Sequence, residues 1–84
     1  MTAKLFVGNF PFSTTEDDLI NLFSEYGVVQ EATIVLDKET SRSRGFGFVT
    51  MMTKEDAGKA REALSGFGLG GRKLVVDDAR ERAR

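Results

Sequence analysis

The spacing of hydrophobic residues predicts a strand and then a helix at the start of the chain. Residues 4–9 are apolar and β-prone, which predicts a first strand. After a short loop, apolar residues recur at helical spacing over residues 19–26. Thr14 or Thr15 is the expected N-cap of this helix, and Gly27 is its expected stop.

The middle of the chain predicts two strands joined by a polar loop. Residues 28–36 are rich in β-branched side chains and predict the second strand, whereas residues 37–43 are polar and charged and predict a mobile hairpin loop. In the strand that follows, Phe46 and Phe48 alternate with small residues, so both rings lie on one side of it. These two rings must therefore be buried together or displayed together.

The last part of the chain predicts a second helix and a final strand. Thr53 is the expected N-cap of this helix, and Gly66 is its expected end. Residues 67–71 contain three glycines and predict a turn or a short ribbon. Residues 73–77 predict the last strand, and the polar residues after it form a charged tail.

The predicted order is β-α-β-β-α-β, which indicates an α+β fold of the ferredoxin-like class: a four-stranded antiparallel sheet with two helices on one face. Right-handed crossovers place both helices on the side of Leu5 and Val7. The opposite face then has no cover in the sequence except the short tail. It carries Phe6, Phe46 and Phe48, so we expect three neighbouring rings on an open sheet.

An alternative is that Phe46 and Phe48 belong to an ordinary sheet core. Arg44 would then share their burial, and burying an unpaired charge is costly. Phe6 taken alone fits either interpretation. The remaining aromatic residues are expected in the core or at helix edges rather than at a ligand: Phe10, Phe12, Phe23, Tyr26 and Phe67.

Composition excludes several classes of chemistry. The 84-residue chain contains no cysteine and no histidine, which excludes disulfides, zinc fingers, thiol nucleophiles and imidazole acid–base catalysis. We therefore expect no enzyme, no metal and no cofactor. The run Glu16-Asp17-Asp18 complements a helix dipole rather than forming a metal site. The sequence has no apolar run near the roughly 18 residues that span a bilayer, so we expect no membrane partner and a cytoplasmic location, with nucleus or organelle as the eukaryotic alternatives.

Charge is nearly balanced overall but unevenly distributed. The net charge of −1 argues against an indiscriminate polyanion binder. Seven acidic residues lie on the two predicted helices, away from the open face. That face and its rim carry eight basic residues against six acidic ones, a small surplus that predicts a shallow salt dependence of nucleic-acid binding.

Two motifs resemble the RNA recognition motif family. The octamer from Arg44 to Met51 reads RGFGFVTM and fits that family's longer motif at every defined position but the last. The hexamer from Leu5 to Phe10 reads LFVGNF and matches the shorter motif, again except at its last residue. The resemblance spans residues 1–80, leaving 81–84 as a short charged tail. Its layout resembles that of small single-domain bacterial RNA-binding proteins and of the RNA-binding part of plant glycine-rich proteins.

The resemblance implies single-stranded RNA binding in RNA processing, stability or translation control, by a monomer, with single-stranded DNA left open as a competitor. Phe6 and Phe48 would each stack a base, and Phe46 would pack against the sugars between them. Arg44 would pair with a phosphate. The other implied RNA contacts are Lys4, Asn9, Arg42, Lys73 and Arg80.

Two other functions fit the same fold. A protein-interaction module would grip peptides with its helices or a modified sheet, but it normally lacks the complete set of three rings. An enzyme resembling acylphosphatases would need an anion-cradling loop, which Asn9-Phe10-Pro11 does not offer. Phenylalanine has no polar edge that distinguishes bases, so the sequence leaves the preferred RNA open.

Overall fold

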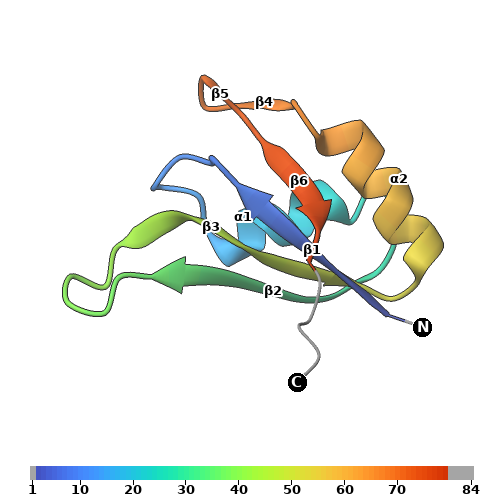
Figure 1. Ribbon diagram of the computed structural model, residues 1–84, viewed down its shortest axis with the longest axis horizontal. Helices are drawn as coiled ribbons and strands as arrows, with labels where there is room; N and C mark the ends of the chain where they lie inside the picture. The colour runs from blue at the N-terminus through green and yellow to red at the C-terminus, as the bar shows by residue number, and fades with distance from the viewer. Residues whose placement is uncertain (1, 80–84) are drawn as a thin grey trace.

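A computed structural model describes residues 2–79 (Figure 1). The three long strands and the two helices lie close to their predicted positions. In chain order the elements are β1 (Ala3–Gly8), α1 (Glu16–Phe23), β2 (Val29–Leu36), β3 (Ser43–Met51), α2 (Lys54–Leu64), β4 (Gly68–Leu69), β5 (Arg72–Lys73) and β6 (Val75–Asp78).

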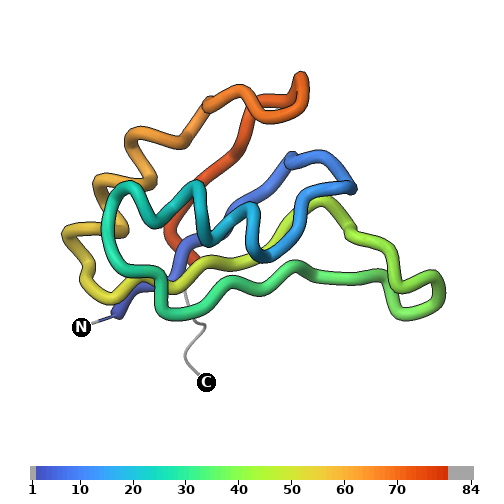
Figure 2. The backbone as a smooth tube through the Cα atoms, turned by 180° about the vertical axis from the view of Figure 1, so that it is seen from behind, coloured from blue at the N-terminus to red at the C-terminus, as the bar shows by residue number. Residues whose placement is uncertain are grey.

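Strands β2, β3, β1 and β6 form one antiparallel sheet in that order. Both helices pack on the same face of this sheet, as the view from behind shows (Figure 2). The strands that carry the two motifs, β1 and β3, are neighbours at its centre, with Phe6 opposite Phe48 and Gly8 opposite Phe46. The predicted ferredoxin-like α+β fold is therefore confirmed.

The hydrophobic core lies between this sheet and the two helices. Alternate residues of β3 are buried, including Val49 and Met51, and they meet buried residues of α1 and α2 such as Phe23 and Leu64. Phe10 is fully buried, as expected.

The expectation of a core or helix-edge position is wrong for Phe12 and Phe67. Their side chains are 66% and 41% exposed. Phe12 lies in the loop between β1 and α1, and Phe67 lies between α2 and β4; neither belongs to the core cluster or packs against it. Tyr26 is partly buried against the core, as expected of a helix-edge residue.

Helix α1 begins as predicted but ends earlier. Thr15 is its N-cap: the Thr15 hydroxyl accepts the Asp18 N–H at 3.1 Å, and the Asp18 carboxylate accepts the Thr15 N–H at 3.0 Å. The predicted stop at Gly27 is wrong, because the helix ends at Phe23 with Ser24 as its C-cap. The Ser24 N–H still donates to the Ile20 carbonyl, but the bond after it is the tighter one from the Tyr26 N–H to the Phe23 carbonyl at 3.0 Å, so the α-helix does not continue.

The region before the last strand also departs from its prediction. The sequence predicts either a turn or a short ribbon for the glycine-rich segment. The structure has a ribbon, which β4 and β5 form. Lys73 belongs to this small hairpin and not to the four-stranded sheet, whose last strand begins at Val75. Leu74 separates β5 from β6, because its backbone forms hydrogen bonds with Gly66 and Phe67 rather than with a neighbouring strand of the four-stranded sheet.

Candidate nucleic-acid interface

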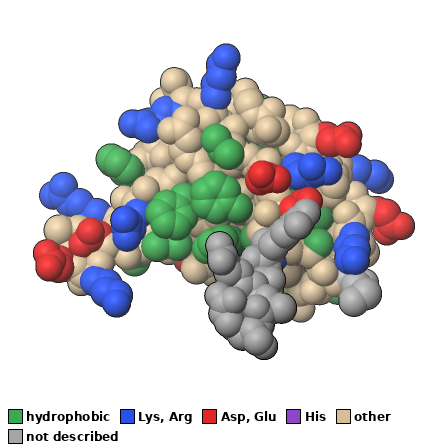
Figure 3. Space-filling model, in the orientation of Figure 1, with side chains coloured by type: hydrophobic (Ala, Val, Ile, Leu, Met, Phe, Trp, Pro, Cys, Tyr) green, Lys and Arg blue, Asp and Glu red, His purple; other side chains and the backbone are tan. Residues whose placement is uncertain are grey.

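Three phenylalanine rings form a cluster on the sheet face that neither helix covers; we call Phe6, Phe46 and Phe48 the ring platform. The Phe6 ring centroid is 5.9 Å from that of Phe46 and 6.0 Å from that of Phe48. All three side chains are only half-buried, while Leu5, Val7 and Val49 on the opposite side of the same strands are fully buried. Figure 3 shows the resulting hydrophobic patch in the middle of this face. The rings are therefore displayed, and the alternative of an ordinary core is wrong.

Two cations lie against the ring platform. The Lys4 ammonium is 5.2 Å from the centroid of the Phe48 ring, and the Arg44 guanidinium carbon is 5.8 Å from that of Phe46. Both distances are within the range of cation–π contacts. Positive charge beside stacked rings is the combination that single-stranded nucleic acid needs, because each nucleotide offers a flat base and a phosphate. The predicted positions of Lys4 and Arg44 beside the rings are confirmed.

One carboxylate lies on the β6 side of the platform. Asp77 is the register partner of Phe6, and its Oδ1 accepts the backbone N–H of Asp78 at 2.8 Å. A carboxylate here disfavours a phosphate at this side of Phe6. It can accept a hydrogen bond from the amino group of a base, as carboxylates do with cytosine. Asp77 is therefore suited to a base edge rather than to the backbone.

Asn9 connects the end of β1 to the β4–β5 hairpin. Its backbone has a positive φ of 63°, and its side-chain amide donates to the Lys73 carbonyl at 2.8 Å. Its Oδ1 accepts from Arg72 Nη1 at 3.2 Å. Asn9 thus holds Arg72 near the sheet, whereas the contact that the structure shows for Lys73 involves its backbone. Sequence reasoning counted Arg72 among the basic residues of the open face and its rim but did not name it as a site residue, since its pairing with Asn9 joins residues 63 positions apart.

The alternation of β3 places the motif glycines Gly45 and Gly47 on the helix side, where we expect them to keep the strand close to the helices. Both lie on the buried side of β3, as their parity predicts. A Cβ on Gly47, however, would overlap the Thr33 carbonyl oxygen of β2, so the glycine keeps β3 close to β2 rather than to the helices. Gly45 has φ +82°, and a Cβ there would lie 3.3 Å from the Phe12 ring.

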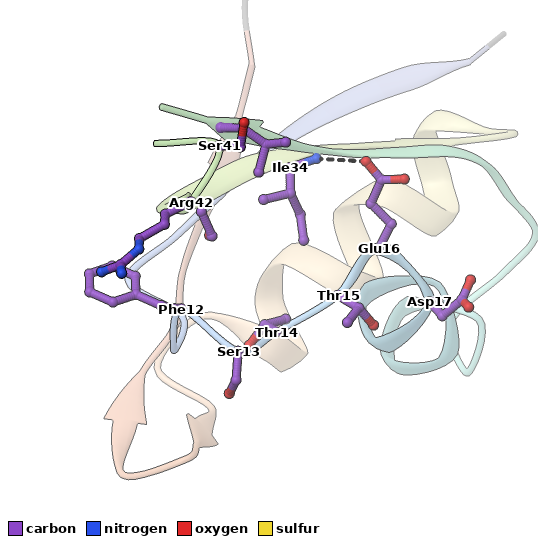
Figure 4. A pocket seen from close by; sticks show the side chains of 11 residues that line it. Phe12, Ser13, Thr14, Thr15, Glu16, Asp17, Ile34, Ser41 and Arg42 are labelled. Carbon is purple, nitrogen blue, oxygen red and sulfur yellow. Dashed lines mark hydrogen bonds between the residues drawn. The ribbon is translucent and has the colours of Figure 1, made fainter. Parts of the chain in front are cut away.

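The β2–β3 hairpin places Arg42 away from the ring platform. Asp37 organises this loop: its carboxylate accepts the N–H groups of Glu39 and Thr40, which hold the pKa of Asp37 below its usual value. Arg42 accepts the Asp37 N–H at 2.8 Å through its carbonyl. In Figure 4 the Arg42 side chain extends toward Phe12, with which it lines a hollow beside the start of α1. Arg80, the last implied contact, lies outside the described residues.

Residues 2–79 have neither a cluster of metal-binding side chains nor a membrane-spanning helix. They contain no group of three or more Asp, Glu, His or Cys side chains arranged to hold a metal ion. None of the helices in this part of the chain has the length and apolar character required to cross a membrane.

A four-stranded antiparallel sheet, backed by two helices and presenting aromatic rings beside cations, defines a class of single-stranded nucleic-acid-binding modules. Comparison with known families narrows this class. The family model described as "RNA recognition motif" matches residues 5–75. The chain therefore belongs to the RNA recognition motif family.

Individual relatives agree with this assignment. The 28 kDa chloroplastic ribonucleoprotein of Spinacia oleracea is 50% identical over 80 residues, which cover 95% of this chain and 34% of that protein. The crystal structure of RNA Binding Protein PG1 is 44% identical with a TM-score of 0.91, covering 98% of this chain and 99% of that one. The first two domains of the yeast poly(U) binding protein Pub1 are 31% identical with a TM-score of 0.88, covering 95% and 48%. The chain thus spans about a third of the length of the Spinacia relative.

Proposed function

We propose that this chain binds single-stranded RNA by stacking bases on the ring platform. The observation that carries the proposal is the set of three half-exposed rings, about 6 Å apart, with Lys4 and Arg44 over two of them. Phe6 and Phe48 each stack a base, and Phe46 packs against the sugars between them. Arg44 contacts a phosphate, with Lys4, Arg42, Lys73 and Arg80 as further contacts and Asn9 as a site residue.

The same proposal includes the bounds of the binding module, its oligomeric state, its competing ligand and its location in the cell. Residues 1–80 form the binding module and 81–84 a short tail; the module acts as a monomer without catalysis, and single-stranded DNA competes for the same rings. The Spinacia relative is named a chloroplastic ribonucleoprotein, which supports a role in RNA processing and an organelle location. That name does not support the cytoplasmic location expected from composition.

An NMR titration with a uridine hexanucleotide tests the proposal directly. Uridine is chosen because one structural relative is a poly(U) binding protein. The ring and backbone signals of Phe6, Phe46 and Phe48 are expected to shift, while those of α1 and α2 stay in place. Shifts confined to the two helices would instead support a protein-interaction module and contradict RNA binding at the sheet.

The salt dependence of binding is expected to be shallow. Four basic residues lie beside an exposed ring: Lys4 and Arg44 over the ring platform, and Arg42 and Arg72 near Phe12. Each phosphate neutralised on a single strand contributes roughly −0.7 to the slope of log affinity against log salt concentration. We therefore expect a slope of about −3, measured by fluorescence anisotropy over a range of KCl concentrations. A slope steeper than about −4 would require more phosphate contacts than this surface provides.

A further inference from the structure

Phe12 is an exposed ring that the ring platform does not include. Its side chain is the most exposed of the large hydrophobic residues described, at 66%. A lone exposed phenylalanine is ordinary, but this one is held in place from several directions. The contacts that hold it come from β3 and from the β4–β5 hairpin, which are distant in the sequence.

On the side of β3, the Phe12 ring packs over the backbone of Gly45. The position that a Gly45 Cβ would occupy is 3.3 Å from Phe12 Cε1, so the absence of a side chain makes room for the ring. The neighbouring Phe10 N–H donates to the Gly45 carbonyl at 3.2 Å, which fixes the loop against the start of β3. The motif glycine therefore positions Phe12 as well as shaping the strand.

On the other side, the β4–β5 hairpin packs against the same loop. Gly70, with φ +60°, has no Cβ where the Pro11 ring lies. Arg72, whose Nη1 donates to Asn9, places its guanidinium carbon 5.8 Å from the centroid of the Phe12 ring. Phe12 thus carries the same kind of cation contact as Phe46 and Phe48.

Phe12 borders two hollows of the surface. The smaller, about 390 Å³, is also lined by Phe6, Phe46, Arg44 and Arg72, so it joins Phe12 to the ring platform. The larger, about 810 Å³, lies beyond Phe12, between the start of α1 and the β2–β3 hairpin (Figure 4). A nucleic-acid strand that leaves the platform through the smaller hollow meets the Phe12 ring next.

We propose that Phe12 stacks one further base of the same RNA strand, and that Arg72 and Arg42 contact the phosphates on either side of that nucleotide. This inference rests on the proposed function, because it extends the ring platform by a fourth ring. The arrangement supplies what each nucleotide needs, an aromatic face and nearby positive charge. Asn9 acts as a positioning residue, since it holds Arg72 through its side chain.

The extension is limited to about one nucleotide by the charges beyond Phe12. Glu16 and Asp17 line the far side of the larger hollow. The Glu16 carboxylate accepts the Ile34 N–H at 3.2 Å, so it is fixed there and repels phosphate (Figure 4). The strand is therefore expected to end its contacts at Phe12 and Arg42 rather than follow the hollow toward α1.

The test compares two lengths of uridine oligomer, a tetranucleotide and an octanucleotide, by NMR titration. Phe12→Ala is expected to weaken octanucleotide binding by about five-fold or more, since alanine substitution of a stacking ring costs at least that much per base. The tetranucleotide, which the ring platform can bind alone, is expected to lose less than two-fold. Phe67→Ala is the matched control, because Phe67 is also exposed but lines neither hollow.

Outcomes that overturn this inference differ from those that overturn RNA binding itself. If Phe12→Ala binds the octanucleotide like the unmodified protein while Phe48→Ala is weakened, the fourth ring does not contact RNA. Equal losses for both oligomers would show that Phe12 acts through the ring platform and not as a separate subsite. If Phe48→Ala retains full affinity, the proposed function fails and the extension fails with it.

Discussion

Replacing Phe48 with alanine is expected to weaken binding of a uridine octanucleotide by about five-fold to more than a hundred-fold. Stacking of a base on an exposed aromatic contributes roughly 1–3 kcal/mol. Phe48 lies at the centre of the sheet, opposite Phe6 in the register and beneath the Lys4 ammonium. Its loss removes one stacking surface and the ring that positions a phosphate-binding cation. Isothermal titration calorimetry of the two proteins measures the difference.

Two comparisons separate lost stacking from lost structure. The Phe48 ring is half-exposed and faces away from the core, so Phe48→Ala is expected to retain a cooperative thermal unfolding transition. Phe48→Tyr keeps an aromatic face and is expected to bind within about two-fold of the unmodified protein. Unchanged affinity in a folded Phe48→Ala protein would refute the stacking role of this residue.

Replacing Gly47 with alanine is expected to destabilise the fold by about 1–3 kcal/mol or more, the usual cost of forcing extra atoms into a packed site. The added Cβ would overlap the Thr33 carbonyl oxygen and crowd the Ile34 backbone. These are backbone atoms of β2, which cannot move aside without disturbing the β2–β3 ladder. Urea denaturation followed by circular dichroism measures the change in the free energy of unfolding.

Gly58 provides the matched control for this substitution. It lies within α2, and a Cβ there would meet no atom within 4 Å other than the adjacent backbone of its own helix. Alanine in a helix interior is more favourable than glycine by roughly 0.5–1 kcal/mol, so Gly58→Ala is expected to stabilise the protein. The two substitutions add the same methyl group with opposite expected signs. If Gly47→Ala were as stable as the unmodified protein, close approach of β3 to β2 would not be the reason for this glycine.

The arrangement of the sheet and the ring platform could be predicted because local patterns determine both. The alternation around Phe46 and Phe48 shows that both rings lie on one side of their strand. The order of elements determines which side of the sheet the helices cover. The cations Lys4 and Arg44 were predictable in the same way, since each lies on the same side of its strand as a platform ring.

The features that escaped prediction depend on contacts between distant segments. Phe12 and Arg72 meet only because the β1–α1 loop packs against the β4–β5 hairpin. The spacing of hydrophobic residues along the sequence does not predict that packing. Helix α1 ends early in a tight last turn, in which the Tyr26 N–H donates to the Phe23 carbonyl. Lys73 was expected in the sheet because its apolar neighbours form a strand-like run, but the bonds of Leu74 divide that run in two.

The cations that lie over the rings also affect whether two copies of this molecule associate through their ring platforms. An uncovered cluster of aromatic rings is the kind of surface that associates with itself. Lys4 and Arg44 place positive charge over Phe48 and Phe46, so two such faces brought together would hold four cations against two Asp77 carboxylates, a net positive charge across an apolar contact. A polyanion removes that repulsion while it occupies the rings. The same two side chains therefore discourage pairing of the empty faces and favour a ligand that carries phosphates.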